Sequence, residues 1–421
     1  MTTGRVFFWI LLTAVAAASF VAIVSRAPVE LRRDRPPADA ADPSLGASFT
    51  EVQIERHDAY RRAAYASFAA ALLLEIAVLL LLARGPLRAL LDRSGSVPGG
   101  WVTRTLVAAL FVVIVAWVAA LPLSYVRGFA IQQAWGLSTQ SGPAWLLDSL
   151  RSLLVGVLIA SAAALTFFGL VRWQPRTWWV WGWAGFTLLT ALLFFLYPVL
   201  IAPLFNRFTP LDDPGLTADI KKLSAEAGIA VDEVLVADAS RRSTLENAYV
   251  AGLGATKRVV LYDTLLAAGS PAETRYVVAH ELGHRVENHI LKNLGLSSGG
   301  LLLGFALLAW LARRDGLWSW GGAAGIHDQA AIPLLLVFTT LLTLVVMPLQ
   351  NLVSRRFESR ADTIALELTE DPETAIKVHR RLAFSNLADL DPPAAAVWLL
   401  YTHPPVGDRI EAAVAEKRTA P

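Results

Sequence analysis

The 421-residue chain contains no cysteine. This absence excludes disulfide bonds, thiolate ligands for a metal ion, a cysteine nucleophile and lipid anchors attached to cysteine. It leaves the redox state of the compartment undecided. Any metal site in this protein must therefore be built from nitrogen and oxygen donors.

Charged residues are scarce. They make up 17% of the chain and hydrophobic residues make up 55%, which is too apolar for an ordinary soluble protein. The formal net charge is only +2, and nothing indicates a nucleic-acid partner. Several apolar runs of about twenty residues explain the composition, because a helix of that length crosses a lipid bilayer. The sequence therefore predicts an α-helical integral membrane protein.

Seven apolar runs are long enough to be membrane spans. We interpret the first as a retained span rather than a cleaved signal peptide, because it is long for a signal sequence and more spans follow. Glu75, in the second run, is an ionisable residue at membrane depth, so we expect it to face the protein interior or a water-filled cavity. We favour the interpretation that it is a satisfied buried carboxyl without a direct role. The predicted spans are residues 7–24, 63–82, 105–126, 153–171, 178–200, 294–310 and 332–346.

The main polar segment lies between the fifth and sixth runs. Its patterns predict an amphipathic helix at 216–227, a strand at 233–237 and a hairpin formed by 246–253 and 257–262. A charged helix is predicted at 351–368, after the seventh run. We therefore divide the chain into a membrane region of five spans (1–202), a soluble segment (203–293), two further spans (294–348) and a C-terminal segment (349–421).

Residues 280–284 read His-Glu-Leu-Gly-His. On a helix, histidines four positions apart lie on one face, so both imidazoles can bind one metal ion. Glu281 lies in the same turn and can take a proton from a metal-bound water. Ser270 as N-cap, Pro271 at the first helical position and Glu273 in a capping box predict the helix independently. This pattern predicts a zinc hydrolase.

A catalytic zinc ion needs three protein ligands and one open position, so a third ligand is required. His289 lies about 180° from His280 round a continuous helix, which favours a surface or supporting role. Glu358 and Asp362 share one face of the charged helix, so Glu358 could ligate while Asp362 accepts the outer N–H of a ligand histidine. A solvated face stabilised by ion pairs is the alternative, and spacing leaves both open.

Six short motifs follow one another along the chain and resemble, in this order, the CAAX prenyl protease type 1 family. That family consists of integral-membrane zinc metallopeptidases related to the HtpX proteases. The resemblance covers residues 203–408 well and the N-terminal part mainly through the layout of the spans. The motifs are IAPLFNRFTPL at 201–211, SRRS at 240–243, NAY at 247–249, KRVVLYDTLL at 257–266, HELGH with NH at 280–289, and FESRAD at 357–362.

The resemblance implies a fold and a metal site. It implies about seven transmembrane helices that enclose a water-filled chamber, with a small α+β zincin-type metalloprotease domain. It also implies one zinc ion per chain, bound by His280, His284 and Glu358, with Asp362 supporting these ligands.

The resemblance further implies a substrate site. Asn247, Ala248 and Tyr249 would form the edge strand along which the substrate backbone lies, although an ordinary hairpin strand would use the same residues. His403 matches a C-terminal His-Pro of the family and would help to stabilise the oxyanion, whereas a histidine before proline is otherwise typical of a structural turn. Arg409 could act similarly or pair with a carboxylate.

We therefore expect a membrane zinc metalloendopeptidase in which Glu281 is the general base for hydrolysis by a zinc-activated water. Its substrates would be CAAX-type C-terminal peptides or membrane proteins under quality control. The alternatives are a non-catalytic receptor or scaffold with a retained protease fold, and a transporter. The intact Glu281 argues against the receptor, and a transporter predicts neither zinc nor peptide cleavage.

The arginine- and alanine-rich composition is typical of a bacterial protein, which predicts the bacterial plasma membrane. Seven spans place residues 26–62 and the soluble segment on one side, and together these carry 17 of the 37 lysine and arginine residues. The positive-inside rule then predicts that the active site faces the cytoplasm. Arginines on the other side argue against this orientation: Arg84, Arg88, Arg93 and Arg104.

Overall fold

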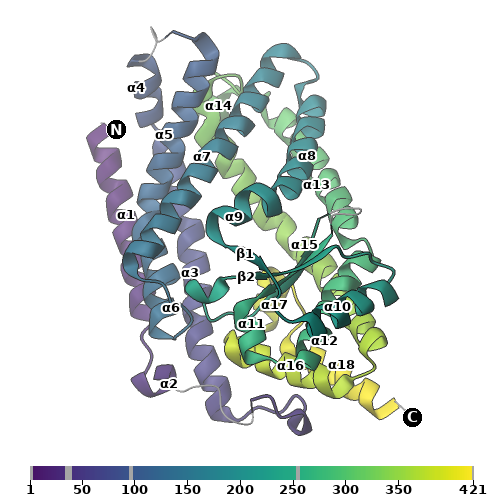
Figure 1. Ribbon diagram of the computed structural model, residues 1–421. Helices are drawn as coiled ribbons and strands as arrows, with labels where there is room; N and C mark the ends of the chain where they lie inside the picture. Colours follow the sequence, from purple (N-terminus) through teal and green to yellow (C-terminus); the bar gives the residue numbers. More distant parts are fainter. Residues whose placement is uncertain (1–2, 34–39, 94–97, 253–256, 420–421) are drawn as a thin grey trace.

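A computed structural model describes residues 3–33, 40–93, 98–252 and 257–419 of the chain (Figure 1). Among these residues, seven helices are long and apolar enough to cross a membrane, which is the predicted number. These helices are α1 (Thr3–Val24), α3 (Glu51–Ala83), α5 (Gly100–Tyr125), α7 (Gly142–Trp173), α8 (Trp178–Leu196), α13 (His289–Leu311) and α15 (Ile332–Thr369).

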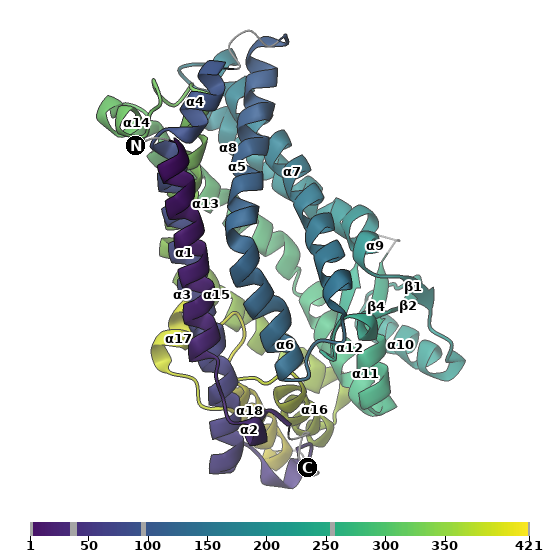
Figure 2. The same ribbon diagram turned by 90° about the vertical axis from the view of Figure 1, so that its left-hand side faces the viewer.

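Two of the long helices continue through π-helical turns. The turn Val126–Ala130 joins α5 to the short helix α6 (Ile131–Ala134). The turn Tyr197–Ile201 joins α8 to α9 (Ala202–Phe205), which leads into the sheet. Figure 2 shows the long helices running side by side over most of the height of the molecule.

The long helices surround two adjoining cavities. One of about 450 Å³ lies between α5, α7, α8, α13 and α15, and one of about 390 Å³ lies between α3, α5 and α15. Val112, Val113 and Leu336 line both, so the two cavities are neighbours within one chamber. Glu75 lines the second cavity and accepts a hydrogen bond from Thr340 Oγ1 at 3.0 Å. Its side chain is exposed, so the expectation of a cavity-facing residue is confirmed. The carboxyl has a hydrogen-bond partner as expected, but the expected burial is wrong.

The last span and the charged helix after it form one helix. We predicted a span at 332–346 and a separate helix at 351–368, but α15 runs from Ile332 to Thr369 with Pro348 inside it. Hydropathy marks where the apolar surface ends and not where the helix ends, and one proline removes a single backbone hydrogen bond without stopping the helix. The residues after Pro348 therefore lie on a direct extension of a span.

A four-stranded sheet lies beside the bundle. Its strands are ordered β1-β2-β4-β3, with β2 and β4 parallel and the other two pairs antiparallel. The strand at 233–237 and the hairpin were predicted, and residues 253–256 between the two hairpin strands lie outside the described residues. The strand at Phe208–Pro210, which pairs with the strand at 233–237, was not predicted. Three residues are too few to show an alternation of apolar and polar side chains. The strands are β1 (Phe208–Pro210), β2 (Glu233–Ala237), β3 (Ala248–Ala251) and β4 (Arg258–Tyr262).

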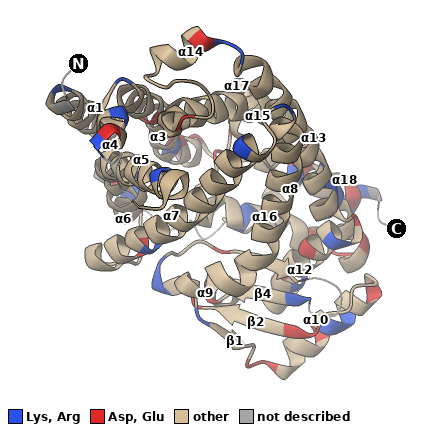
Figure 3. Cartoon of the chain, turned by 90° about the horizontal axis from the view of Figure 1, so that it is seen from above, with Lys and Arg blue, Asp and Glu red and all other residues tan. Residues whose placement is uncertain are grey.

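Shorter helices pack around the sheet and at the ends of the bundle. A core of buried apolar residues, including Ile220, Leu261 and Leu282, joins the sheet to its helices. Figure 3 shows charged residues around the sheet and at helix ends, whereas the long helices are mostly uncharged. The shorter helices are α2 (Val29–Arg33), α4 (Pro86–Arg93), α10 (Pro214–Glu226), α11 (Asp263–Ala268), α12 (Pro271–Val286), α14 (Asp315–Trp320), α16 (Pro372–Ser385), α17 (Ala394–Leu400) and α18 (Val406–Thr419).

Candidate metal centre and active site

The start of α12 is determined by local side-chain contacts, as predicted. Ser270 Oγ accepts a hydrogen bond from the Glu273 N–H at 3.3 Å, and the Glu273 carboxylate accepts one from the Ser270 N–H at 2.6 Å. Pro271 occupies the first helical position. A defined first turn sets the direction of every later side chain, so these caps orient the residues at 280–284.

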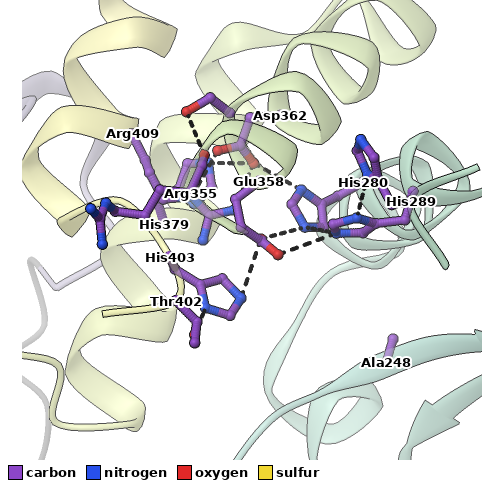
Figure 4. A network of polar contacts seen from close by, with 12 residues as sticks. Ala248, His280, His289, Arg355, Glu358, Asp362, His379, Thr402, His403 and Arg409 are labelled. Carbon is purple, nitrogen blue, oxygen red and sulfur yellow. Dashed lines mark hydrogen bonds and ion pairs between the residues drawn. The ribbon is translucent and has the colours of Figure 1, made fainter. Parts of the chain in front are cut away.

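Three donor groups meet where α12 crosses α15 (Figure 4). His280 Nε2 lies 3.3 Å from one oxygen of Glu358, and His284 Nε2 lies 3.5 Å from the other. The two Nε2 atoms are 3.2 Å apart. Tetrahedral ligands about 2.0–2.1 Å from a zinc ion are separated by about 3.3–3.4 Å, so one ion of that size fits between these atoms. Glu358 Oε2 is buried without a hydrogen-bond partner among the described residues, which suits an oxygen that binds a metal.

A buried carboxylate orients the first histidine. Asp362 Oδ1 lies 2.8 Å from His280 Nδ1, so the Nδ1–H can donate to it and leave the Nε2 lone pair for a cation. Arg409 donates to both oxygens of Asp362, at 2.8 and 2.6 Å. Arg409 was expected either to help stabilise the oxyanion or to pair with a carboxylate. The structure shows the second role, because Arg409 pairs with Asp362.

A second buried histidine adjoins this group without joining the metal cluster. His379 Nε2 lies 3.1 Å from the hydroxyl of Tyr276 and 3.9 Å from Asp362. Burial lowers the pKa of His379 to about 3, so its ring is neutral at physiological pH. A neutral ring leaves Arg409 as the positive partner of the Asp362 carboxylate.

His289 lies elsewhere than the helical geometry predicts. The prediction assumed a continuous helix, but α12 ends at Val286 and Asn288 has a left-handed backbone with φ 53°. Asparagine tolerates this conformation, and the break returns His289 to the site. Its Nδ1 lies 2.9 Å from His284 Nδ1, and its ring stacks on Phe357 at 4.1 Å. His289 is only 3% exposed, so the surface alternative is wrong and the histidine supports His284 instead.

Glu281 lines a cavity of about 440 Å³ beside the three donors, together with Asn247, Tyr401 and His403. Burial raises the pKa of Glu281 to about 7. A carboxyl group that titrates near neutral pH can both accept and release a proton. Burial opposes the charged form of His280, but its hydrogen bond to Asp362 outweighs this and raises its pKa to about 10. The negative charge of Asp362 also favours a metal cation at Nε2 of His280, because a proton and a metal ion compete for that nitrogen.

His403 lies at the mouth of this site. Its Nε2 is 3.2 Å from Glu358 Oε2, and its side chain is 56% exposed. Thr402 Oγ1 lies 2.9 Å from its Nδ1. A residue far away in the sequence thus lies beside the three donor groups with one ring nitrogen directed at them.

The predicted substrate strand forms one edge of the described sheet, next to α12. Tyr262 N–H donates to Asn247 O at 3.0 Å, so in this antiparallel pair the backbone groups of Ala248 and Val250 point to the open edge. Arg285 of α12 donates to the Val250 carbonyl. The Ala248 N–H meets the Asn247 side chain at 2.9 Å. The open edge therefore lies close to the candidate metal site.

Both halves of the chain match known families. Residues 30–207 match the CAAX prenyl protease N-terminal family of five membrane helices, and residues 210–417 match peptidase family M48. An uncharacterized metalloprotease of Bacillus subtilis, YhfN, is 35% identical over 301 residues, which are 70% of each chain. The chain therefore belongs to the membrane metalloproteases of peptidase family M48.

One curated protein and one solved structure are similar to most of this chain. CAAX prenyl protease 1 of Saccharomyces cerevisiae is 30% identical over 317 residues, which are 71% of this chain and 70% of that protein. The crystal structure of S. mikatae Ste24p matches with a TM-score of 0.78 at 24% identity, over 96% of this chain and 98% of that one. The predicted fold class, a helical membrane chamber with a small metalloprotease domain, is confirmed.

Close packing between two backbones brings the donor groups together, and Gly283 makes it possible. A Cβ at this position would lie 3.0 Å from Ala361 Cα and 3.1 Å from Ala361 O. Because backbone atoms cannot move aside, Gly283→Ala should push α12 away from α15 and weaken metal binding. We expect a loss of stability of about 1–3 kcal/mol, as for other overpacked cores. Thermal unfolding and the metal content per chain measure both effects.

Gly295→Ala is the matched control, since a Cβ there would meet no atom within 4 Å. It should unfold and bind metal like the parent protein. If Gly283→Ala also matched the parent in both measurements, the close helix contact would not be needed for the site.

Proposed function

We propose that this protein is a zinc metalloendopeptidase in which His280, His284 and Glu358 bind one zinc ion per chain and Glu281 is the general base. The observation that carries the proposal is the set of three donor groups beside Glu281, whose nearest donor atoms lie 3.2–3.5 Å apart in each pair. Two neutral imidazoles and one carboxylate are a donor set typical of catalytic zinc, and they leave one position open.

Zinc bound there would polarise the scissile carbonyl and lower the pKa of the attacking water. Glu281 would accept the proton from that water and then deliver it to the leaving amine. Asp362 keeps His280 in the tautomer with a free Nε2, and His289 can do the same for His284. The chain itself therefore supplies the proton transfers and the orientation of the ligands.

The substrate would bind as an added strand. An extended peptide along Asn247, Ala248 and Tyr249 could pair with the backbone groups at the open edge of the sheet, which holds its scissile bond near Glu281. His403 would then stabilise the oxyanion. When the Thr402 hydroxyl donates to Nδ1, the ring proton lies on Nε2, the nitrogen directed at the metal site.

We propose CAAX-type C-terminal peptides, or membrane proteins under quality control, as the substrates. The relatives named CAAX prenyl protease 1 in yeast and plants support the first class. The chamber supports a substrate that enters from the membrane, because its larger cavity is lined mainly by apolar side chains such as Phe167, Leu301 and Phe338. The complete donor set and the intact Glu281 argue against a non-catalytic scaffold.

We further propose a bacterial plasma membrane location with the active site toward the cytoplasm. Arg61, just before the second predicted span, donates to the Leu387 carbonyl at 2.7 Å, so residues 51–62 lie at the same end of the molecule as the catalytic segment. Figures 1 and 2 show the N-terminus toward the opposite end from the C-terminus. The relative in Bacillus subtilis supports a bacterial origin.

The direct test is to purify the full chain in detergent, measure zinc per chain and assay cleavage of a farnesylated CAAX peptide beside its unmodified form. We expect one zinc ion per chain and cleavage that a chelator stops and added zinc restores. Cleavage of both peptides would favour a general membrane protease, and cleavage of the farnesylated peptide alone would favour CAAX processing. A protein that neither binds zinc nor cleaves peptide would favour the transporter.

A further inference from the structure

One face of α15 carries two different pairs of polar residues. Asn351, Arg355, Glu358 and Asp362 follow at intervals of four, three and four, which keeps them on one side of a helix. The second pair belongs to the candidate metal site. The first pair contacts the chain at the end of α17, a region to which the proposed function assigns no role.

Both residues of the first pair donate to backbone carbonyls. Asn351 Nδ2 donates to Leu399 O at 2.6 Å. Arg355 Nη1 donates to Val397 O at 2.9 Å and to Tyr401 O at 2.7 Å. Carbonyls in the last turn of a helix lack partners within that helix, and a positive charge there also complements the helix dipole. The Val397 carbonyl also accepts the Tyr401 N–H at 3.4 Å. Asn351 and Arg355 thus hold the end of α17 and the first residue after it.

The residues that leave α17 include His403. It follows Tyr401 by two positions, and its Nε2 lies 3.2 Å from Glu358 Oε2. Beyond it, Pro404 and Pro405 restrict the backbone before α18 begins at Val406. Arg409 of α18 then binds Asp362. Segment 401–409 is therefore attached at both ends to the helix that carries Glu358.

We propose that Arg355 is a positioning residue for proteolysis, which holds the Val397 and Tyr401 carbonyls so that His403 directs Nε2 at the metal centre. Arg355 touches neither the three donor groups nor the open edge strand, so it acts through His403. The proposal rests on the proposed function of His403 and deepens it. A residue that only capped α17 would affect folding and not the role of His403 in the reaction.

A double-mutant cycle in the full-length protein separates these two roles. The variants are H403A, R355A and the combination of both, with kcat, KM, zinc per chain and thermal unfolding measured for each. If His403 stabilises the oxyanion, we expect H403A and R355A each to lower kcat by about a hundred- to a thousandfold, with KM and zinc content unchanged. The double variant should be no slower than H403A alone, because both changes remove the same interaction.

Two further variants make the cycle decisive. R355K keeps the charge but has a single ammonium in place of the planar fork, so it should recover part of the lost kcat in the parent background and none in H403A. R356A removes the exposed neighbouring arginine and should behave like the parent. R355K also serves as the working variant if R355A does not fold.

Three results would overturn the proposal. Effects of R355A and H403A on kcat that multiply would show that Arg355 acts independently of His403. Loss of zinc or of folding in both R355A and R355K would show a structural role only. If H403A had the kcat of the parent, His403 would have no role in the reaction and Arg355 could not act through it. Chelator-sensitive cleavage by the parent protein would still support the zinc protease itself.

Discussion

Glu281→Gln is expected to abolish peptide hydrolysis while the protein keeps its zinc ion. The amide has nearly the same shape as the carboxylate, but it cannot take a proton from water at neutral pH. General bases contribute about 10²–10⁴-fold to rate, so we expect kcat to fall by about 10³-fold or more. His280, His284 and Glu358 are untouched, so zinc per chain should stay at the parent value. Steady-state cleavage of the better of the two CAAX peptides, with zinc analysis of the same sample, measures both.

Glu287→Gln is the matched control for this change. Glu287 caps the same helix, and its carboxylate pairs with Lys292 at 2.9 Å and Arg360 at 3.0 Å, away from the donor groups. The Glu287→Gln variant should cleave peptide at close to the parent rate. Parent-like cleavage by Glu281→Gln itself would exclude Glu281 as the general base.

Glu358→Ala should lose both zinc and activity. The change removes the only donor that α15 gives to the proposed cluster and leaves two imidazoles on α12, which is one ligand short of a catalytic zinc site. Loss of a supporting residue alone costs about 10–100-fold in metal affinity, so loss of a ligand should cost more. Zinc titration against a competing chelator measures the affinity, and the peptide assay measures activity.

Glu367→Ala is the control on the same helix, since Glu367 is solvent-exposed and pairs with Arg360 at 3.2 Å. It should keep the zinc affinity and activity of the parent. Parent zinc content in Glu358→Ala would remove Glu358 from the ligand set, and the third ligand would have to be sought among the neighbouring polar groups. Together with Glu281→Gln, this variant separates loss of the base from loss of the metal.

The parts of the site that local sequence predicts are those whose geometry is local. Ser270, Pro271 and Glu273 begin α12 as expected, and 3.6-residue periodicity alone places His280 and His284 on one face. The spans were predicted for a similar reason, because hydropathy depends only on neighbouring residues. The ends of the helices were not predicted, since α15 continues through Pro348 into polar sequence.

The errors arose where a conformation or a contact depends on more than periodicity. His289 was placed by assuming a continuous helix, whereas the left-handed backbone at Asn288 starts a new one. The Asn-His pair at the end of the helix was the available signal, since asparagine often adopts this conformation. Strand β1 was missed because it owes its conformation to pairing with β2 and not to its own three residues.

The sequence by itself determined the membrane spans, the capped helix with two histidines and Glu281, and the absence of any thiolate ligand. Spacing alone left Glu358 between a metal ligand and a solvated helix face. Only the tertiary structure brings it to His280 and His284, because Gly283 lets α12 approach the backbone of α15 closely. The same packing, with Arg355 at the end of α17, brings His403 to the site. A metal centre needs donors from segments far apart in the chain, and their meeting depends on packing between helices that no local pattern encodes.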